Sequence, residues 1–248
     1  MADQPAPAPL LIACALGIEH LALRRRDRGE AGGPVTVLRT GMGPKAAENS
    51  VTRLLADPAY AEAAVLATGF CAGLAPGMHP GDLVVADETR DPRATVTCEG
   101  TDLLVKVLAR MLPGHTVHTG PLTGSDHVVR GPERSALRAT GAIAVDMESA
   151  ATLLSAVRSG ERPVAAVRVV VDAPEHELVR IGTVRGGISA FRVLRSVLPA
   201  FFTNGTAMCC SPGGEPDGHA AAPVHQGRYI SGRTEAAQAG QVPAHCGA

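Results

Sequence analysis

Two carboxylate side chains near the middle of the chain stand where a buried strand is expected to give way to a helix. Asp146 and Glu148 follow the small, apolar segment 140–144 and precede the helical pattern of 149–157. In open α/β sheets, ligands bind outside the carboxyl ends of the strands, at junctions of this kind. A carboxylate there suits two vicinal hydroxyls, because each of its oxygens can accept a hydrogen bond from an O–H. The alternative is that both are helix-start carboxylates favoured by the helix dipole, and this segment alone favours neither interpretation.

Two further carboxylates stand at expected strand ends. Glu19 follows the apolar segment 10–15, and Asp172 ends the strongest strand pattern, 164–171. Because the carboxyl ends of neighbouring parallel strands meet at one edge of a sheet, we expect Glu19, Glu148 and Asp172 to converge on one pocket.

Two segments rich in glycine, 40–44 and 68–77, also follow expected strands. Gly43 precedes a helix expected over 45–55, so backbone N–H groups there are free to meet an anion or a hydroxyl. The small residues of the second segment would let its backbone approach a ligand closely. Each segment could instead be a tight connection, and a lone G-x-G is weak support. Their shared character favours a ligand.

Strand and helix patterns alternate along the chain, which is typical of an α/β fold. Strands are expected at 10–15, 35–38, 63–67, 81–88, 117–122, 140–144 and 164–171, and helices at 16–24, 45–55, 101–112, 132–139, 149–157 and 188–198. The chain has 248 residues, of which 45% are hydrophobic, and this fits one large domain. We predict a single three-layer α/β/α domain over residues 9–204, with a central mixed sheet.

The amino-acid composition limits which binding partners and which cellular compartment we expect. The net charge of −1 gives no electrostatic reason for binding nucleic acid or a membrane surface, and with 2% aromatic residues a platform for stacking bases is not expected. The first apolar segment is too short to span a bilayer and has no basic residues before it, so we expect no signal peptide and no membrane span. The six cysteines show no paired spacing, which indicates reduced thiols in the cytoplasm.

Both ends of the chain differ from the domain. Residues 1–8 and 205–248 are predicted to be disordered, because they have too few aliphatic residues to bury a core. The second segment contains cysteine and histidine, but without regular ligand spacing we predict no metal site.

Taken in order, the motifs resemble those of the nucleoside phosphorylase and nucleosidase superfamily, which includes purine nucleoside phosphorylase and methylthioadenosine/adenosylhomocysteine nucleosidase. The resemblance extends from Leu10 to about Leu198. It rests on Glu19 after the first strand, Gly41-Met-Gly43, the segments 68–76, 80–85 and 145–149, and Arg168 with Asp172. It implies cleavage of the N-ribosidic bond of a purine nucleoside, most simply one of adenine, without a cofactor. It also implies a homodimer or a larger homo-oligomer.

Within the superfamily, segment 120–129 followed by 140–149 is similar to the hopanoid-associated branch, the adenosylhopane phosphorylases. This resemblance implies a lipid-linked adenine nucleoside as the substrate. Methylthioadenosine/adenosylhomocysteine or futalosine-type hydrolysis is the alternative reaction. A nucleoside-binding protein of the same fold without catalysis is a further alternative.

The resemblance also implies roles for individual residues. Asp172 corresponds to the acid that shares a proton with the purine, a role in which partial burial helps the carboxyl keep its proton. Glu148 corresponds to the acceptor for the ribose diol, Met147 to the residue that packs under the sugar, and Glu19 to the residue that orients or deprotonates water. The remaining residues expected to bind substrate or nucleophile are Val145, Gly43, Thr68, Gly69, Phe70, Cys71, His127, Val128 and Arg168.

Two departures from the family pattern bear on the nucleophile and the base. Val171 stands before Asp172 where nucleosidases carry a small hydroxyl residue, and Phe70 occupies a position often held by Ser. Cations that could hold inorganic phosphate as a co-substrate are few, and Arg168 could equally be structural. The sequence therefore leaves water and phosphate open as the nucleophile. The cations in question are Arg39, Lys45 and Arg168.

Overall fold

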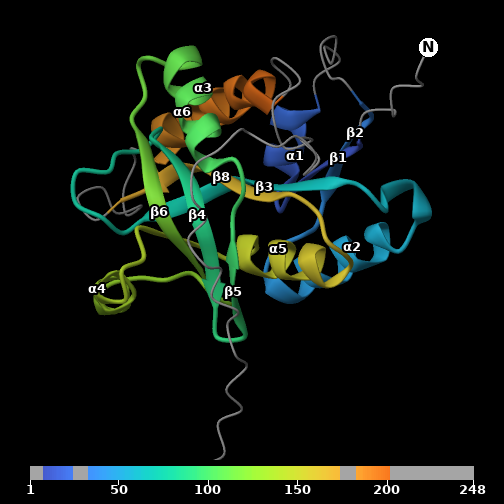
Figure 1. Ribbon diagram of the computed structural model, residues 1–248. Coiled ribbons are helices and arrows are strands. Elements are labelled where there is room, and N and C mark those ends of the chain that lie inside the picture. Colours follow the sequence, from blue (N-terminus) through green and yellow to red (C-terminus); the bar gives the residue numbers. More distant parts are fainter. Residues whose placement is uncertain (1–7, 25–32, 174–182, 202–248) are drawn as a thin grey trace, which may run out of the picture. The chain divides into compact units, whose positions relative to one another are not determined.

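The computed structural model describes residues 8–24, 33–173 and 183–201 (Figure 1). The ends predicted to be disordered, 1–8 and 205–248, lie outside these residues except for residue 8. The strands are β1 (Leu10–Cys14), β2 (Val35–Arg39), β3 (Ala64–Gly73), β4 (Leu83–Asp91), β5 (Ala94–Thr97), β6 (Val117–Gly124), β7 (Ala144–Asp146) and β8 (Val164–Asp172). The helices are α1 (Gly17–Leu23), α2 (Pro44–Leu55), α3 (Thr101–Met111), α4 (Pro132–Ala139), α5 (Ser149–Arg158) and α6 (Thr183–Val197), with short 3₁₀ helices η1 (Pro58–Tyr60) and η2 (Leu198–Phe201).

Local sequence accounts for where the helices begin. Gly43 precedes α2 with a φ of 88°, and Pro44 follows at the first helical position, where its missing N–H costs nothing. Ala47, Val51 and Leu55 then recur every four residues and are all buried. The helix α4 begins in the same way, with a glycine of positive φ followed by proline. Both helices were therefore predicted, α4 with its observed bounds and α2 from residue 45 instead of Pro44.

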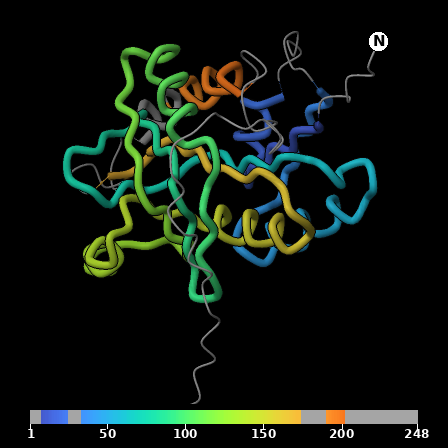
Figure 2. The backbone as a smooth tube through the Cα atoms, viewed as in Figure 1, coloured from blue at the N-terminus to red at the C-terminus, as the bar shows by residue number. Residues whose placement is uncertain are grey.

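The strands form one mixed sheet in the order β2-β1-β3-β7-β6-β4-β5, and β8 pairs with both β3 and β4. The pairs β1–β2, β1–β3, β3–β8, β4–β6 and β6–β7 are parallel, whereas β3–β7, β4–β5 and β4–β8 are antiparallel. Because β8 joins β3 to β4, the strands β3, β7, β6, β4 and β8 close into a ring. Figure 2 shows β3 and β8 side by side through the centre of the described region. The predicted mixed sheet is confirmed, but its closure was not anticipated.

Helices cover both faces of this sheet, which gives the three predicted layers. Alternate residues of β1 face opposite sides, with Ile12 and Cys14 in one buried cluster and Leu11 and Ala13 in the other. The first cluster includes residues of α1, α3 and α6, and the second includes residues of α2 and α5. In Figure 1 these two sets of helices lie on opposite sides of the strands.

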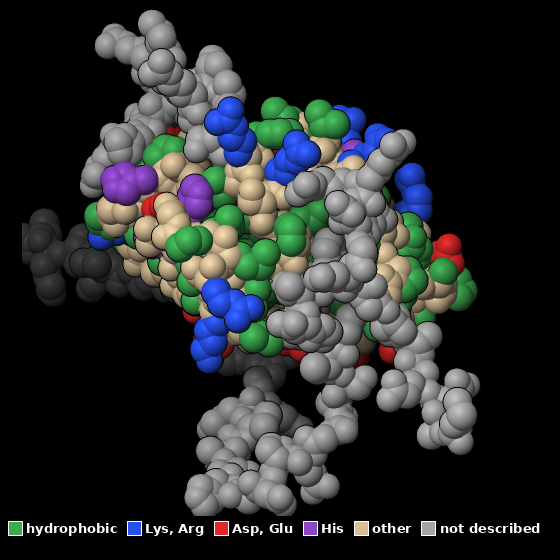
Figure 3. All heavy atoms as spheres, turned by 90° about the horizontal axis from the view of Figure 1, so that it is seen from above, with side chains coloured by type: hydrophobic (Ala, Val, Ile, Leu, Met, Phe, Trp, Pro, Cys, Tyr) green, Lys and Arg blue, Asp and Glu red, His purple; other side chains and the backbone are tan. Residues whose placement is uncertain are grey.

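The described residues carry no helix long and apolar enough to cross a membrane. Figure 3 shows that Lys and Arg side chains on the face seen from above are spread among hydrophobic and neutral ones and do not gather in one patch.

The structure corrects two predicted segments. The glycine-rich segment 68–77 is not a loop over its first six residues, because β3 continues to Gly73 while β8 supplies hydrogen-bond partners alongside it. The strand expected at 140–144 begins only at Ala144, since Thr140 ends α4 and Gly141 turns the chain with a φ of 89°.

The short strand β5 was missed. It pairs with β4 after a turn in which the Asp91 carboxylate accepts hydrogen bonds from the backbone N–H groups of Arg93, at 2.8 Å, and of Ala94, at 3.1 Å. This use of an Asp side chain in a turn is a local sequence signal, so the Asp-Pro-Arg segment could have predicted the hairpin.

Candidate active site

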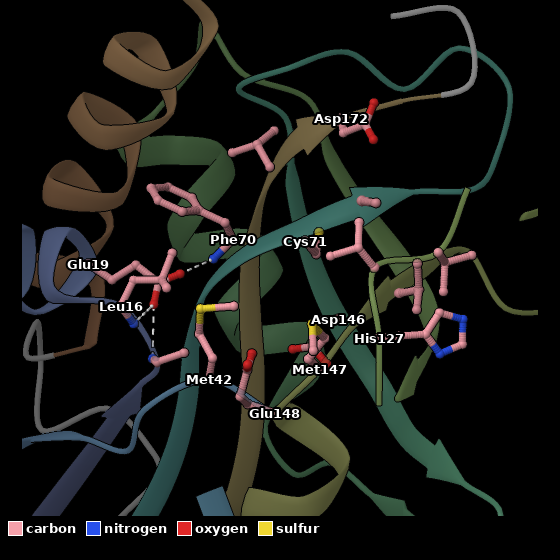
Figure 4. A pocket seen from close by; sticks show the side chains of 16 residues that line it. Leu16, Glu19, Met42, Phe70, Cys71, His127, Asp146, Met147, Glu148 and Asp172 are labelled. Carbon is pink, nitrogen blue, oxygen red and sulfur yellow. Dashed lines mark hydrogen bonds between the residues drawn. The ribbon is translucent and has the colours of Figure 1, made fainter. Parts of the chain in front are cut away.

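Glu19, Glu148 and Asp172 line one cavity of about 240 Å³ (Figure 4). Glu19 lies in α1 just beyond β1, Glu148 lies between β7 and α5, and Asp172 ends β8. In Figure 4 these three side chains surround the cavity from different elements, with Phe70 and Met147 between them. Six further predicted residues line the same cavity, namely Val145, Met147, Phe70, Cys71, His127 and Val128. The topology thus brings together the strand ends that the sequence singled out.

The carboxylate of Glu19 is held by three backbone N–H groups. Its Oε2 accepts hydrogen bonds from Ala15 at 2.9 Å and Leu16 at 2.8 Å, and its Oε1 accepts one from Phe70 at 2.8 Å. The side chain is buried. A carboxylate offers about four acceptor positions, so three protein donors fix its orientation and leave room for about one more partner.

Glu148 connects the start of α5 with the start of α2. Its Oε1 accepts a hydrogen bond of 2.8 Å from the backbone N–H of Gly43. Burial raises the pKa of Glu148, the Arg168 guanidinium opposes the rise, and the neighbouring Asp146 and Glu19 add to it. Among the described residues, only the Gly43 N–H donates to this partly desolvated carboxylate, so Glu148 can accept further hydrogen bonds from a polar ligand.

The two central carboxylates, Asp146 and Glu148, differ in whether they bind the start of α5. Asp146 accepts a hydrogen bond of 3.2 Å from the backbone N–H of Ser149, at the first position of α5, and one of 2.6 Å from the Ser149 hydroxyl. Asp146 is therefore a helix-start carboxylate. Glu148 makes no side-chain hydrogen bond to the start of α5.

Arg168 forms a buried hub behind the cavity wall. Its Nη2 lies 2.7 Å from the Asp146 carboxylate, its Nε donates to the Ser149 hydroxyl at 2.8 Å, and its Nη1 donates to the carbonyl oxygen of Thr68 at 3.0 Å. The side chain is 1% exposed. Each of its three guanidinium nitrogens has a protein partner, and Arg168 does not line the cavity.

Asp172 has a charged partner that the sequence did not reveal. Its Oδ2 accepts a hydrogen bond of 3.0 Å from Nη1 of Arg134, a residue of α4, and Nη2 of Arg134 donates to the carbonyl oxygen of Gly73 at 2.8 Å. The Asp172 side chain is 15% exposed. Partial burial is therefore present as expected, but it is accompanied by an ion pair.

The rim of the cavity is exposed and carries a clamped histidine. Nδ1 of His127 lies 2.6 Å from the Asp126 carboxylate, and its Nε2 lies 3.0 Å from that of Glu133. The hydrogen bonds to Asp126 and Glu133 raise the pKa of His127. Val128 and Met42, which also line the cavity, have 59% and 63% of their surface exposed.

Four residues predicted to bind substrate are not in the cavity wall. Arg168 and Thr68 are held in the buried hub, and the Thr68 hydroxyl donates to the carbonyl oxygen of Val167. Gly69 packs against this hub, and Gly43 acts through its N–H on Glu148. None of the four lines the cavity, because Thr68, Gly69 and Arg168 lie in buried strands and Gly43 precedes a helix; their contact with a ligand stays a prediction.

Six lining residues were not predicted. Each is close in sequence to a predicted residue or motif. Their positions could therefore have identified them as lining residues, whereas their residue types could not. They are Ala15, Leu16, Met42, Ala72, Val129 and Val171.

The charges on the wall favour some ligands over others. The described lining contains the four carboxylates Glu19, Asp146, Glu148 and Asp172, and it contains no Lys or Arg. Over the described part of the chain, no three His, Cys, Asp or Glu side chains lie close enough to hold a metal ion. Such a wall can orient hydroxyl groups and move protons, but it repels anions.

A second, larger cavity adjoins the first. It has a volume of about 640 Å³, and Met147 belongs to the walls of both cavities. The other walls come from the starts of α2 and α5, the β4–β5 turn, α4 and the segment after β6, and they include Pro44, Pro92, Leu137 and Ala150.

Comparison with known proteins identifies the family. The sequence model of the phosphorylase superfamily matches residues 17–199, which include every residue that lines the cavity except Ala15 and Leu16. This match covers more than half of the chain.

Solved structures with the same fold share little sequence with this chain. The 5′-methylthioadenosine/S-adenosylhomocysteine nucleosidase of Neisseria meningitidis, in complex with methylthio-immucillin-A, superposes with a TM-score of 0.66 at 20% identity, over 77% of this chain and 97% of that one. The corresponding S. pneumoniae enzyme gives a TM-score of 0.61 at 22% identity, over 78% and 99%. A futalosine hydrolase mutant from Helicobacter pylori gives 0.62 at 16% identity, over 77% and 99%. At these identities the likeness establishes the fold.

Proposed function

Because this chain belongs to the phosphorylase superfamily, we propose that it hydrolyses the N-ribosidic bond of an adenine nucleoside, with water as the nucleophile. The observation that carries the proposal is the wall on which Glu19, Glu148 and Asp172 meet. N-ribosidic cleavage passes through a sugar with oxocarbenium character, which needs a held nucleophile on one side and a protonated leaving base on the other.

The charge of the wall favours water over inorganic phosphate. Phosphate would have to enter among four carboxylates without a Lys or Arg side chain in the described lining, and Arg168 binds Asp146, Ser149 and Thr68 behind it. Water carries no charge and benefits from carboxylate acceptors. The electrostatic balance therefore supports hydrolysis.

Glu19 is the residue for the nucleophile. Its three backbone donors hold the carboxylate in one orientation, and the remaining acceptor position binds one water molecule. As the water oxygen bonds to C1′ of the ribose, one of its protons passes to Glu19. The preorganised carboxylate does not need to reorient during this step.

Glu148 is the residue for the ribose. With Oε1 bound to the Gly43 N–H, its free lone pairs accept hydrogen bonds from the 2′ and 3′ hydroxyls, while Met147 packs against the sugar. This contact serves the ground state and the transition state alike, so it contributes to binding as well as to turnover.

Asp172 is the acid for the leaving base. Its O–H bond breaks as a ring nitrogen of adenine gains the proton and the C1′–N bond breaks. The carboxylate is then protonated again from solvent, and Glu19 releases the proton that it took from water. The sum is nucleoside plus water giving ribose derivative plus adenine.

The second cavity supports a substrate with a substituent at C5′ of the ribose. A ribose held by Glu148 beside Met147 has this space of about 640 Å³ on the other side of the Met147 side chain. Methylthioadenosine and adenosylhomocysteine, after which the similar nucleosidases are named, carry such substituents. The lipid-linked nucleoside implied by the hopanoid-associated resemblance is the bulkiest of this class.

The proposal is tested by incubating the protein with adenosine and with 5′-alkylthio and 5′-alkyl adenosines, with and without inorganic phosphate. Chromatography would measure released adenine and free or phosphorylated sugar. We expect adenine and free sugar whether or not phosphate is present. Sugar 1-phosphate as the product would establish phosphorolysis, and tight binding without adenine release would establish a nucleoside-binding protein.

Two variants separate the assigned roles. Asp172→Asn should bind nucleoside as the wild type does but lower turnover by roughly a hundredfold or more, the usual range for losing a general acid. Glu148→Gln should weaken binding and turnover together. Wild-type turnover by Asp172→Asn would contradict protonation of the base by this residue.

A further inference from the structure

Arg134 contacts the proposed acid from a helix that the mechanism above does not use. It lies in α4, where Pro132 follows Gly131, which has a φ of 54°. Its guanidinium reaches the Asp172 carboxylate at 3.0 Å through Nη1 and the Gly73 carbonyl oxygen at 2.8 Å through Nη2. The Arg134 side chain is only 7% exposed, so this ion pair is largely removed from solvent.

The surroundings of Arg134 fix its position. Gly73 ends β3, and its neighbour Ala72 pairs with Asp172 at the end of β8, so one guanidinium joins two strand ends. Glu133, the preceding residue, is held by His127 across the rim of the cavity. Both contacts keep the first turn of α4 against the cavity wall.

The pairing is incomplete in a way that points to a ligand. Oδ1 of Asp172 and Nε of Arg134 are both buried, and neither has a hydrogen-bond partner among the described residues. A buried polar atom without a partner costs free energy, and a pair with a purely structural role would normally satisfy both carboxylate oxygens. One oxygen is fixed by Arg134, and no residue of the described segments engages the other, which is therefore open to a ligand.

We propose that Arg134 is the positioning residue for Asp172, an inference that rests on the proposed function. Arg134 holds Oδ2, so that Oδ1 carries the proton that passes to the leaving base. When the O–H bond of Asp172 breaks and the N–H bond of adenine forms, the carboxylate left behind is neutralised by the guanidinium. Arg134 therefore promotes transfer of the proton to the base while leaving sugar binding unchanged.

The test is a double-mutant cycle on base release from the best adenine nucleoside of the panel. Arg134→Met should lower kcat by about ten- to a hundredfold, the factor that corresponds to losing a hydrogen bond to a charged group, with KM nearly unchanged. In the Asp172→Asn background the same substitution should change kcat by less than about threefold, because the two residues act as one unit. Arg134→Lys keeps the charge and should recover part of the loss.

A substrate that needs no acid provides a second readout. The leaving group of p-nitrophenyl riboside departs as a stable anion, so Arg134→Met and Asp172→Asn should both cleave it at close to the wild-type rate. A general disturbance of the fold would lower this activity as well. Arg138→Met, an exposed residue of the same helix, is the matched control and should behave as the wild type throughout.

The outcomes distinguish this inference from the proposed function. If the wild-type protein releases adenine and Arg134→Met does so equally well, the role of Arg134 is overturned and the proposed function stands. The same holds if the decrease in kcat caused by Arg134→Met adds in full to the decrease caused by Asp172→Asn. If the wild-type protein releases no base from any nucleoside, both fail.

Discussion

Substitution of Gly69 by alanine is the most direct probe of how tightly the site is built. Gly69 lies in β3 with a φ of 139°, a conformation that residues with a side chain rarely adopt. A Cβ added there would lie 2.5 Å from Oε1 of Glu19 and 2.7 Å from Nη1 of Arg168. Neither atom can move freely, since Glu19 is bound by three backbone N–H groups and Arg168 by the buried hub.

The cost follows from these contacts. Forcing alanine into this backbone conformation costs about 1–3 kcal/mol. Displacing Glu19 breaks at least its hydrogen bond from Phe70, a bond to a charged group and so about 1.5–3 kcal/mol. Gly69→Ala should therefore lower the free energy of unfolding by roughly 2.5–6 kcal/mol. At about 2–4 °C per kcal/mol for a domain of this size, the melting temperature should fall by roughly 5–24 °C.

Thermal denaturation would measure the loss of stability, and the base-release assay would measure the effect of displacing Glu19 on activity. Gly141→Ala is the control, because Gly141 also has a positive φ, of 89°, but a Cβ there meets nothing within 4 Å. The control should lose only the conformational part, about 1–3 kcal/mol, and keep its activity. If Gly69→Ala were no less stable than Gly141→Ala and fully active, the close packing of Gly69 against Glu19 and Arg168 would be refuted.

Two further predictions concern ionisation. Burial raises the pKa of Glu148, so its charged form costs folding free energy above the folded pKa, and the cost vanishes below the unfolded one. Glu148→Gln should thus raise the melting temperature at pH 8 but not at pH 4 while it weakens nucleoside binding; an unchanged melting temperature at pH 8 would contradict this. Hydrogen bonds to Asp126 and Glu133 raise the pKa of His127, so its stabilising contribution is complete below the unfolded pKa and lost as pH rises through the folded one. An NMR titration should give His127 a higher pKa than that of an unperturbed histidine, and Asp126→Asn should lower this pKa. An unchanged pKa in Asp126→Asn would contradict the stabilising hydrogen bond between His127 and Asp126.

The family and the three carboxylates could be predicted from the sequence because their signals are local. Helix starts such as Gly43-Pro44 and strand patterns such as 164–171 depend on neighbouring residues. The strands β1 and β8 both run parallel to β3, so Glu19 and Asp172 follow strand ends at one edge of the sheet. The strand β7 runs antiparallel to β3, so the position of Glu148 beside them depends on how the sheet closes. Even the wrong boundaries of the strands that end at Gly73 and begin at Ala144 did not disturb this placement.

Contacts between residues far apart in sequence could not be predicted in this way. Arg134 meets Asp172 across 38 positions of the chain, and Arg168 reaches the Thr68 carbonyl oxygen across 100. Nothing in the composition of α4 distinguishes Arg134 from the exposed Arg138 one turn later. Its burial depends on the ring of strands that closes through β8, which brings the end of β3 beside that of β8.

The sequence by itself determined which residue types were available for acid, base and diol contacts, because these depend on side-chain chemistry and on position at a strand end. Only the tertiary structure decided which of them are free to act. Packing engages Arg168 with Asp146 and Ser149, and so removes a cation that the sequence offered for phosphate. A buried charge must be paired, and which partner pairs with it is set by the closure of the sheet, which no local pattern encodes.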